Sequence, residues 1–251
     1  MAKNRQRSHT TFRFKRFEIS NSRSAQRVGT DGVITGAAAP VESESPVEIW
    51  DAGAGTGLIA LMLAQRNPLA HITAIEIDPE AASECRANVA ASPWPDRVDV
   101  VCDDIGVIAP SLPRPDIIVS NPPFFASGDS GTPDARRALA RHDGTLGPLT
   151  LISLAARSLN PGGRLTFIAP YDRNDSIMFH ASLERMQPVA TLDIASRENR
   201  EPIRRLWTMM RRDDAAMRPC MSGRLDIHPS ATPATYTEAY RLLTGDFYLD
   251  F

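Results

Sequence analysis

The feature that most constrains this chain is a regular alternation of strand-like and helix-like segments. Short apolar runs rich in β-branched residues are separated by segments with the composition of helices. This alternation is typical of βαβ units, in which helices join parallel strands. It predicts an α/β fold with a doubly wound, mostly parallel, seven-stranded sheet. The predicted strands are 47–51, 71–77, 98–102, 116–120, 164–169, 190–195 and 204–210.

Length and composition are compatible with one domain of this kind. The chain has 251 residues, of which 42% are hydrophobic and 23% charged, and this composition excludes global disorder. No apolar run approaches the roughly 18 residues of a membrane-spanning helix. The basic N-terminus lacks the apolar region of a secretory signal. Three cysteines without CxxC spacing and five scattered histidines favour a reduced, cytoplasmic compartment and no metal site.

Charge is distributed unevenly, although the formal net charge is only −2. Residues 1–30 carry eight basic side chains and one acidic side chain, a net charge of +7, which leaves −9 for the remainder. A basic segment attached to an acidic body predicts a polyanionic partner. The alternative is a solvated tail that aids solubility.

A glycine-rich loop, Asp51-Ala52-Gly53-Ala54-Gly55-Thr56-Gly57, follows the first predicted strand and precedes a helical segment. Glycines let the backbone turn tightly and approach a ligand without an intervening Cβ. A dinucleotide site of the G-x-G-x-x-G type would need its third glycine where Leu58 stands, which weakens a dehydrogenase interpretation. The form D-x-G-x-G-x-G instead resembles the first motif of Rossmann-like methyltransferases that use S-adenosylmethionine.

Further acidic residues follow the next two strands. Glu76 ends the second strand, where a carboxylate can accept hydrogen bonds from both hydroxyls of a ribose. Asp103 and Asp104 follow the third strand, and one of them could hold the amino group of the cofactor's adenine. Register with the methyltransferase pattern favours Asp104, and an ordinary turn is the alternative. The predicted cofactor residues are thus Asp51, Gly53, Gly55, Gly57, Glu76 and Asp104.

The segment Asn121-Pro122-Pro123-Phe124 follows the fourth strand, at the edge of the sheet where doubly wound folds bind ligands. It resembles the (N/D)-P-P-(Y/F) signature of methyltransferases that modify a planar nitrogen conjugated to a π system. Because the lone pair of such a nitrogen is delocalised, it attacks poorly. We expect Asn121 Oδ1 and the Pro122 carbonyl to accept its two N–H bonds, and Phe124 to stack on the base. Asn121 is also expected to lie beside the cofactor.

Across residues 12–251 the sequence resembles the bacterial tRNA1(Val) (adenine-N6)-methyltransferases, which methylate adenine 37, next to the anticodon. Four stretches carry the resemblance: Phe12–Phe17 with Val28–Gly32, the glycine loop with Leu61–Arg66, Ser120–Phe125 with Ala140–His142, and Tyr236–Tyr240 with Asp246–Leu249. It implies S-adenosyl-L-methionine as cofactor, tRNA as partner, a monomer in the cytoplasm, and Thr30 and Asp31 near the cofactor. The chain departs from the family at Phe124, where tyrosine is frequent, and at Trp50, where a smaller residue is more usual.

Under this resemblance the basic residues gain a role. Arg13, Lys15 and Arg16 in the arm, and Arg141 after the Asn-Pro-Pro-Phe segment, would contact tRNA phosphates and position the RNA without specifying its sequence. A second group could extend this basic face, diluted by nearby glutamates: Arg197, Arg200, Arg204, Arg205, Arg211 and Arg212. The chain is then divided into a basic arm with a cofactor-proximal segment (1–32) and a methyltransferase domain (33–251).

Three other functions remain as alternatives. An N5-glutamine protein methyltransferase shares the Asn-Pro-Pro-(Tyr/Phe) motif but usually has a longer helical N-terminal region. An rRNA guanine-N2 methyltransferase usually has histidine where Phe125 stands, and often a duplicated domain. A non-catalytic nucleic-acid-binding protein on a decayed methyltransferase fold would not need the glycine loop, Glu76 and Asn121 to be intact.

Overall fold

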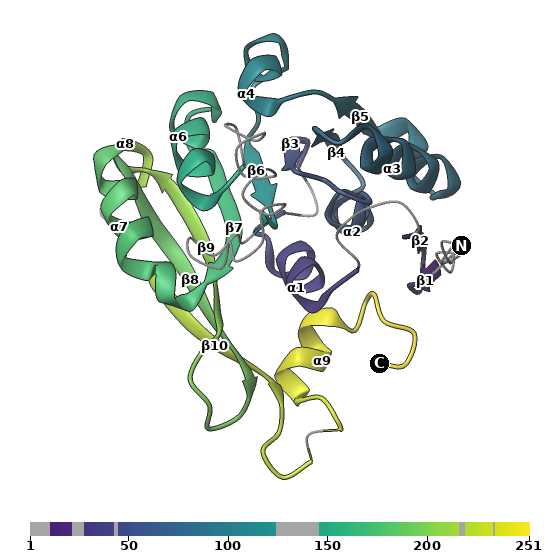
Figure 1. The fold of residues 1–251 in the computed structure, drawn as a ribbon, viewed down its shortest axis with the longest axis vertical. Coiled ribbons are helices and arrows are strands. Elements are labelled where there is room, and N and C mark those ends of the chain that lie inside the picture. Colours follow the sequence, from purple (N-terminus) through teal and green to yellow (C-terminus); the bar gives the residue numbers. More distant parts are fainter. Residues whose placement is uncertain (1–10, 22–27, 43–44, 124–145, 216–218, 233) are drawn as a thin grey trace, which may run out of the picture.

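The fold is centred on one eight-stranded sheet, with the strand order β10-β8-β9-β7-β6-β3-β4-β5 (Figure 1). This computed structural model describes residues 11–21, 28–42, 45–123, 146–215, 219–232 and 234–251. Within this sheet β9 is antiparallel to its neighbours β7 and β8, and the other adjacent pairs are parallel. The strands are β3 (Val47–Ala52), β4 (Ala70–Glu76), β5 (Val98–Cys102), β6 (Ile117–Ser120), β7 (Arg164–Pro170), β8 (Met186–Arg197), β9 (Arg204–Arg211) and β10 (Met221–His228).

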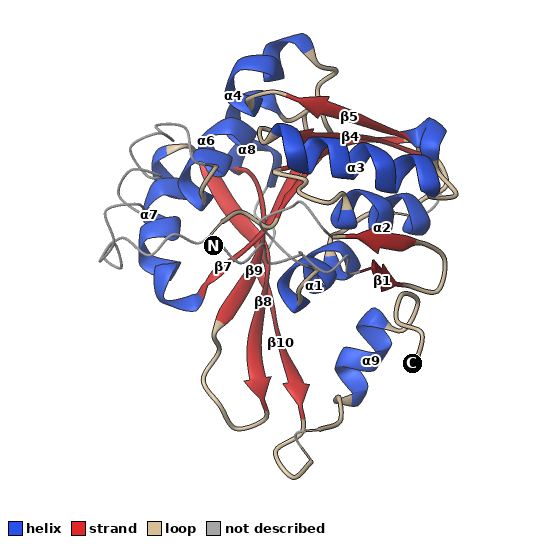
Figure 2. Cartoon of the chain, turned by 45° about the vertical axis from the view of Figure 1, so that its right-hand side comes forward, coloured by secondary structure: helices blue, strands red, loops and turns tan. Residues whose placement is uncertain are grey.

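Helices cover both faces of the sheet (Figures 1 and 2). One face is covered by α1 (Thr30–Ala38), α2 (Leu58–Arg66), α3 (Pro79–Ala91) and, beside α1, α9 (Glu238–Thr244). The other face is covered by α4 (Ile105–Ile108), α6 (Pro148–Ser158) and α7 (Asn174–Leu183). Because successive side chains of a strand point to opposite faces, Ile49 packs toward α2 while Trp50 and Ala52 pack toward α6.

Short elements connect these layers. The 3₁₀ turns are η1 (Pro95–Arg97), η2 (Ala109–Ser111) and η3 (Tyr171–Arg173), and α8 (Arg212–Ala215) follows β9. The helix α3 begins as its sequence predicts, because Asp78 caps it by accepting hydrogen bonds from Glu80 N and Ala81 N, and Pro79 occupies its first position.

The predicted mostly parallel sheet is confirmed, but the sheet has eight strands where seven were expected. The additional strand is β10, which pairs with β8 at the edge of the sheet. Its first four residues are exposed, and Leu225 is its only fully buried side chain. A strand that buries so little has no strong apolar pattern, and this explains why the sequence does not reveal it.

The predicted division at residues 32 and 33 stays a prediction. Part of the segment before it packs tightly on the rest of the chain. A small hairpin of β1 (Thr11–Arg13) and β2 (Glu18–Ser20) precedes α1. Phe14, Phe17 and Ile19 of this region are buried in the same hydrophobic cluster as α2 and α3. Among the residues described above, no helix is long and apolar enough to cross a membrane.

Candidate active site

The predicted motifs meet where the parallel strands β3 to β6 end. Gly53 N and Ala54 N, which follow β3, donate to Ile75 O of β4 at 2.9 and 3.1 Å. Ser120 Oγ at the end of β6 donates to Ala52 O of β3 at 2.7 Å. The sheet order reverses between β3 and β6, and this switch point is where doubly wound folds form a ligand crevice.

The glycine loop adopts a backbone that side chains disfavour. Gly53, Gly55 and Gly57 have φ angles of +72°, +54° and +83°, in the left-handed region that glycine enters without a steric penalty. A Cβ at Gly57 would lie 2.8 Å from Cys85 Sγ, so this glycine also lets α3 pack closely against the start of α2. The loop therefore presents bare backbone at the switch point, as a closely bound ligand requires.

Asp51 lies beneath this loop and is fully buried. Its Oδ2 accepts a hydrogen bond from Ala60 N in the first turn of α2 at 2.9 Å, whereas its Oδ1 has no partner among the described residues. Burial raises the pKa of Asp51 to about 7, and the negative charge of Glu76 adds to the increase. Asp51 thus anchors the loop to α2 and keeps one buried oxygen unpaired.

Glu76 is held by backbone groups on both of its oxygens. Oε2 accepts from Gly55 N at 2.8 Å and Oε1 accepts from Asp78 N at 2.9 Å. A carboxylate has about four lone-pair sites, so each oxygen retains the capacity to accept a second hydrogen bond. The arrangement fixes Glu76 beside the glycine loop and leaves it able to accept from paired hydroxyls.

The two aspartates after β5 are engaged in a turn. Asp104 caps α4 by accepting from Gly106 N at 2.7 Å, and Asp103 Oδ1 accepts from Asp104 N at the same distance. Asp103 N also donates to Glu76 O at 3.2 Å, so the turn lies beside the end of β4. Asp104 therefore caps α4 close to the end of β4, and its role toward an adenine stays a prediction.

Asn121 is the first residue after β6, and its Oδ1 is buried without a hydrogen-bond partner among the described residues. A Cβ at Gly32 would lie 3.7 Å from Asn121 Nδ2, so the first turn of α1 packs beside this side chain. That turn carries Thr30 and Asp31, which the family resemblance implies lie near the cofactor. Pro122 is buried directly after Asn121, and Phe124 lies outside the described residues.

The predicted RNA-binding residues of the arm have partners within the chain. Arg13 pairs with Glu18 at 3.0 Å, and both side chains are mostly exposed. Lys15 Nζ donates to the carbonyl oxygens of Gly245 and Phe251, each at 2.6 Å. Arg16 lies over the Trp94 ring, 5.6 Å from its centroid. Lys15 therefore ties the arm to the C-terminal segment; Arg141 lies outside the described residues.

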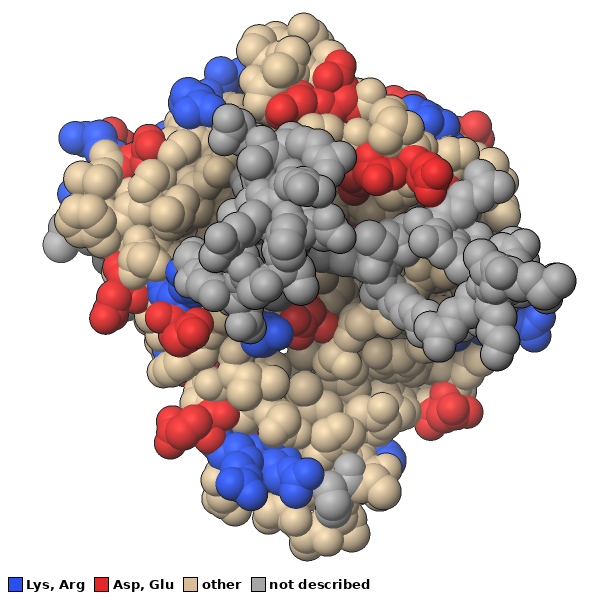
Figure 3. Space-filling model, viewed as in Figure 1, with Lys and Arg blue, Asp and Glu red and all other residues tan. Residues whose placement is uncertain are grey.

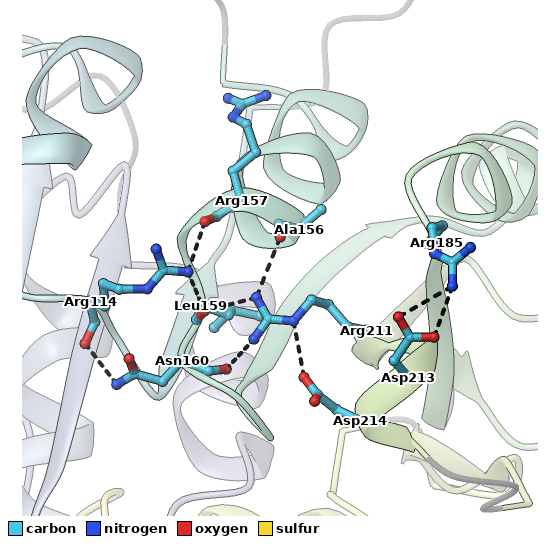
Figure 4. A network of polar contacts seen from close by, with 9 residues as sticks. All are labelled: Arg114, Ala156, Arg157, Leu159, Asn160, Arg185, Arg211, Asp213 and Asp214. Carbon is cyan, nitrogen blue, oxygen red and sulfur yellow. Dashed lines mark hydrogen bonds and ion pairs between the residues drawn. The ribbon is translucent and has the colours of Figure 1, made fainter.

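The later arginines are close together in the sequence, but in the structure Arg204 and Arg205 lie at one end of β9 and Arg211 lies at its other end. Arg211 lies at the far edge, and its guanidinium faces the end of α6 (Figure 4). There it donates to Leu159 O at 2.9 Å and to Asn160 O at 2.6 Å, and its Nε pairs with Asp214 at 3.0 Å. This network satisfies the carbonyl groups left open where a helix ends, which is a structural role.

Arg204 and Arg205 begin β9 at the same edge as Asn121, because β9 runs antiparallel to β7. Arg204 pairs with Asp31 of α1 at 3.0 Å, and Arg205 pairs with Asp193, the residue directly opposite it in β8. Neither pair is apparent in the sequence, because strand register sets the second and the first joins residues 173 positions apart. On the face shown in Figure 3, basic (blue) and acidic (red) side chains are interspersed, and the described residues form no single continuous basic patch there.

These residues fit S-adenosyl-L-methionine, the cofactor that the motifs imply. The bare glycine backbone, the paired acceptors of Glu76 and the unpartnered oxygens of Asp51 and Asn121 match a ligand with hydroxyl groups, N–H donors and positive charge. No group of three or more histidine, cysteine, aspartate or glutamate side chains in the described ranges is placed to hold a metal ion.

Comparison with known proteins gives consistent results. A family model described as "Methyltransferase small domain" matches residues 39–192. Relatives named tRNA1(Val) (adenine(37)-N6)-methyltransferase are 42% identical in Porphyromonas gingivalis, over 94% of each chain. In Aeromonas hydrophila subsp. hydrophila the identity is 39%, over 95% of this chain and 97% of the relative.

Solved structures share the fold at low sequence identity. A predicted O-methyltransferase from Agrobacterium tumefaciens has a TM-score of 0.66 at 19% identity, covering 86% of this chain and 96% of its own. TYW2 from M. jannaschii, solved in complex with AdoMet, has a TM-score of 0.56 at 11% identity, covering 82% of this chain and 88% of its own. These likenesses support the Rossmann-like methyltransferase fold.

Proposed function

Because this chain belongs to the tRNA1(Val) (adenine(37)-N6)-methyltransferase family, we propose that the crevice between β3 and β6 carries out this family's reaction. The enzyme transfers a methyl group from S-adenosyl-L-methionine to N6 of adenine 37 in tRNA1(Val). The single observation that carries the assignment of the site is Asn121 Oδ1 at the end of β6, which is buried and has no hydrogen-bond partner in the described part of the chain.

The role of Asn121 follows from the chemistry of the acceptor. The N6 lone pair of adenine is delocalised into the ring, so the nitrogen is a weak nucleophile. If Asn121 Oδ1 and the Pro122 carbonyl accept its two N–H bonds, the nitrogen is held in place and its move toward tetrahedral geometry is favoured. The bound cofactor supplies a methyl group on a cationic sulfonium. The methylated nitrogen loses its extra proton readily, so no strong base is needed.

The cofactor would bind in the part of the crevice formed by the loops that follow β3, β4 and β5, through the residues described above. Glu76 accepts hydrogen bonds from the ribose hydroxyls, the glycines at 53, 55 and 57 allow close backbone approach, and Asp104 lies where an adenine amino group would be recognised. Thr30 and Asp31 close the crevice from α1. Asp51 supports the loop from beneath, since its Oδ2 is bonded to Ala60 N.

The remaining assignments concern the partner and the compartment. The target base must leave its stack to reach Asn121, and this costs less in an anticodon loop than in a duplex. We propose that Phe124 stacks on the base, that Arg13, Lys15, Arg16 and Arg141 contribute to tRNA binding, and that the enzyme works as a cytoplasmic monomer.

A labelling experiment tests the reaction. The purified protein is incubated with S-adenosyl-L-methionine labelled in its methyl group and with unmodified total tRNA, and the labelled nucleoside is then mapped. We expect N6-methyladenosine at position 37 of tRNA1(Val). Label in protein, or in N2-methylguanosine, would identify one of the rival methyltransferases instead.

Replacing Asn121 tests the site separately. We expect Asn121→Ala to lower single-turnover methyl transfer by at least about 100-fold, since an acceptor that orients the nucleophile typically contributes this much. Calorimetric titration should show cofactor affinity within a few-fold of the wild type. A large loss of cofactor affinity would mean that Asn121 chiefly binds the cofactor.

A further inference from the structure

A layered cluster of side chains lies beyond Asn121 at the same edge of the sheet. Arg205 contacts Asp193 through two hydrogen bonds, Nε to Oδ1 and Nη2 to Oδ2 at 2.9 Å. Its guanidinium carbon lies 5.2 Å from the ring centroid of Trp207 and 4.7 Å from that of Tyr171. Trp207 is fully buried, whereas Tyr171 is partly exposed. The cluster thus extends from the core to a partly exposed tyrosine.

The position of Tyr171 is fixed by main-chain and side-chain contacts. It is the first residue of η3, directly after β7, and its backbone N donates to Ile203 O at 3.2 Å. Its hydroxyl lies 3.3 Å from Arg205 Nη2. A bidentate arginine–carboxylate pair is rigid, and a guanidinium stacks well on an aromatic ring. The ring is therefore held in one orientation before any ligand binds.

The register of β6 and β7 locates Tyr171 relative to Asn121. Ser120 lies opposite Phe167, so Tyr171 extends three residues farther along its strand than Asn121 does. At about 3.3 Å per residue this is about 10 Å. An adenine whose amino group is held at Asn121 does not reach that far, but the next nucleotide of a splayed strand does.

Charge indicates what this cluster can recognise. Arg205 and Asp193 neutralise each other, and their side chains are only 19% and 23% exposed. A neutral, rigid aromatic platform is poorly suited to a phosphate and well suited to the face of a base. Resting on the proposed function, we propose that Tyr171, backed by Arg205, is a stacking site for a base adjacent to adenine 37.

Matched variants test this platform in the full-length protein. Tyr171→Leu removes the ring, and Tyr171→Phe keeps the ring without its hydroxyl. Loss of one base–aromatic stack should raise the Kd of Tyr171→Leu for unmodified tRNA1(Val) by about five- to 150-fold. Tyr171→Phe should bind within about twofold of the wild type. Cofactor affinity, measured by calorimetry, should be unchanged in both variants.

A fluorescent base provides a readout that does not depend on a variant folding. With 2-aminopurine on either side of position 37, the wild type should quench one of the two labelled tRNAs, and Tyr171→Phe should keep that quenching. No quenching at either neighbour would overturn the proposal. So would tRNA binding by Tyr171→Leu within twofold of the wild type, or an equal loss of cofactor and tRNA binding. The proposed function is tested separately, because it is rejected if the wild type does not methylate tRNA, whatever the binding and quenching experiments show.

Discussion

At the end of the sheet where the parallel strands end and the proposed active site lies, two groups of strands hold their charged side chains in different ways. In the cofactor half, formed by β3, β4 and β5 with the loops that follow them, carboxylates are held by backbone N–H groups. Glu76 accepts from Gly55 N, Asp51 from Ala60 N and Asp104 from Gly106 N. In the distal half, formed by β7, β8 and β9, arginines are held by carboxylates: Arg204 by Asp31 and Arg205 by Asp193.

This difference indicates what each half can tolerate. Every residue except proline has a backbone N–H, so a carboxylate held by such a group depends chiefly on the local path of the chain. An arginine held by a carboxylate depends on a second side chain and loses its orientation when that side chain changes. We therefore expect changes in the cofactor half to affect folding and cofactor affinity, and changes in the distal half to affect RNA binding.

The largest effect should come from the buried carboxylate of Asp51. Its pKa in the folded protein is raised to about 7, chiefly by burial. Because this value exceeds the unfolded one, the stabilisation from the bound proton is complete below pH 3.8 and is lost as the pH rises through about 7. Relative to the wild type, Asp51→Asn should gain up to about 4 kcal/mol of unfolding free energy between pH 4 and pH 8.

Urea unfolding of both proteins over that pH range measures this gain. Glu76→Gln serves as the control, because the charge of Glu76 contributes to the raised pKa of Asp51. Removing that charge should lower the pKa of Asp51 and move the pH dependence of stability to lower pH than in the wild type. Stability curves of wild type and Asp51→Asn that run parallel would show that Asp51 has an ordinary pKa.

The next prediction tests whether the cofactor half affects cofactor affinity without affecting tRNA affinity. Glu76→Ala removes a carboxylate that holds the glycine loop and, in our proposal, accepts from the ribose hydroxyls. We expect cofactor affinity to fall by at least about 150-fold, because each of two charge-assisted hydrogen bonds contributes about 1.5 kcal/mol or more. Affinity for tRNA, measured by fluorescence anisotropy, should stay within twofold. A parallel loss of tRNA affinity would mean that the halves are coupled.

The cofactor half could be predicted from the sequence, because its parts are local. The glycine loop lies between one strand and the next helix, and Glu76 and Asp104 follow the next two strands. Parallel strands must end at the same edge, so strand order alone brings these residues together. The fold class, the methyltransferase activity and the cofactor were predicted in this way and are confirmed.

The distal half could not be predicted in the same way. Arg205, Arg211 and Arg204 are indistinguishable in a list of basic residues, yet their partners differ. Antiparallel insertion of β9 places the first four residues of the strand near the crevice and its last residues at the opposite edge. The partner of Arg204 is 173 residues away, and no short motif encodes such a pair. The edge strand β10 was missed because it buries almost nothing.

The smallest effect concerns the arm, where the three predicted RNA contacts differ in how strongly they are engaged within the protein. Lys15 is bonded to two carbonyl oxygens and Arg16 lies over Trp94, so their replacement would also disturb packing. Arg13 is 70% exposed, and its ion-pair partner among the described residues is the exposed Glu18. It is therefore the arm residue whose charge can be removed with least structural change, since an exposed ion pair contributes little to stability.

We expect Arg13→Ala to weaken tRNA binding a few-fold at low salt and to lower the slope of log Kd against log salt by about 0.7–0.9, the value of one phosphate contact. Glu18→Ala is the matched control, because it breaks the same ion pair and keeps the cation. It should leave the slope unchanged or steepen it by freeing Arg13. Equal slopes for Arg13→Ala and wild type would assign the charge of Arg13 to solubility, and Lys15, Arg16 and Arg141 would remain as the predicted phosphate contacts.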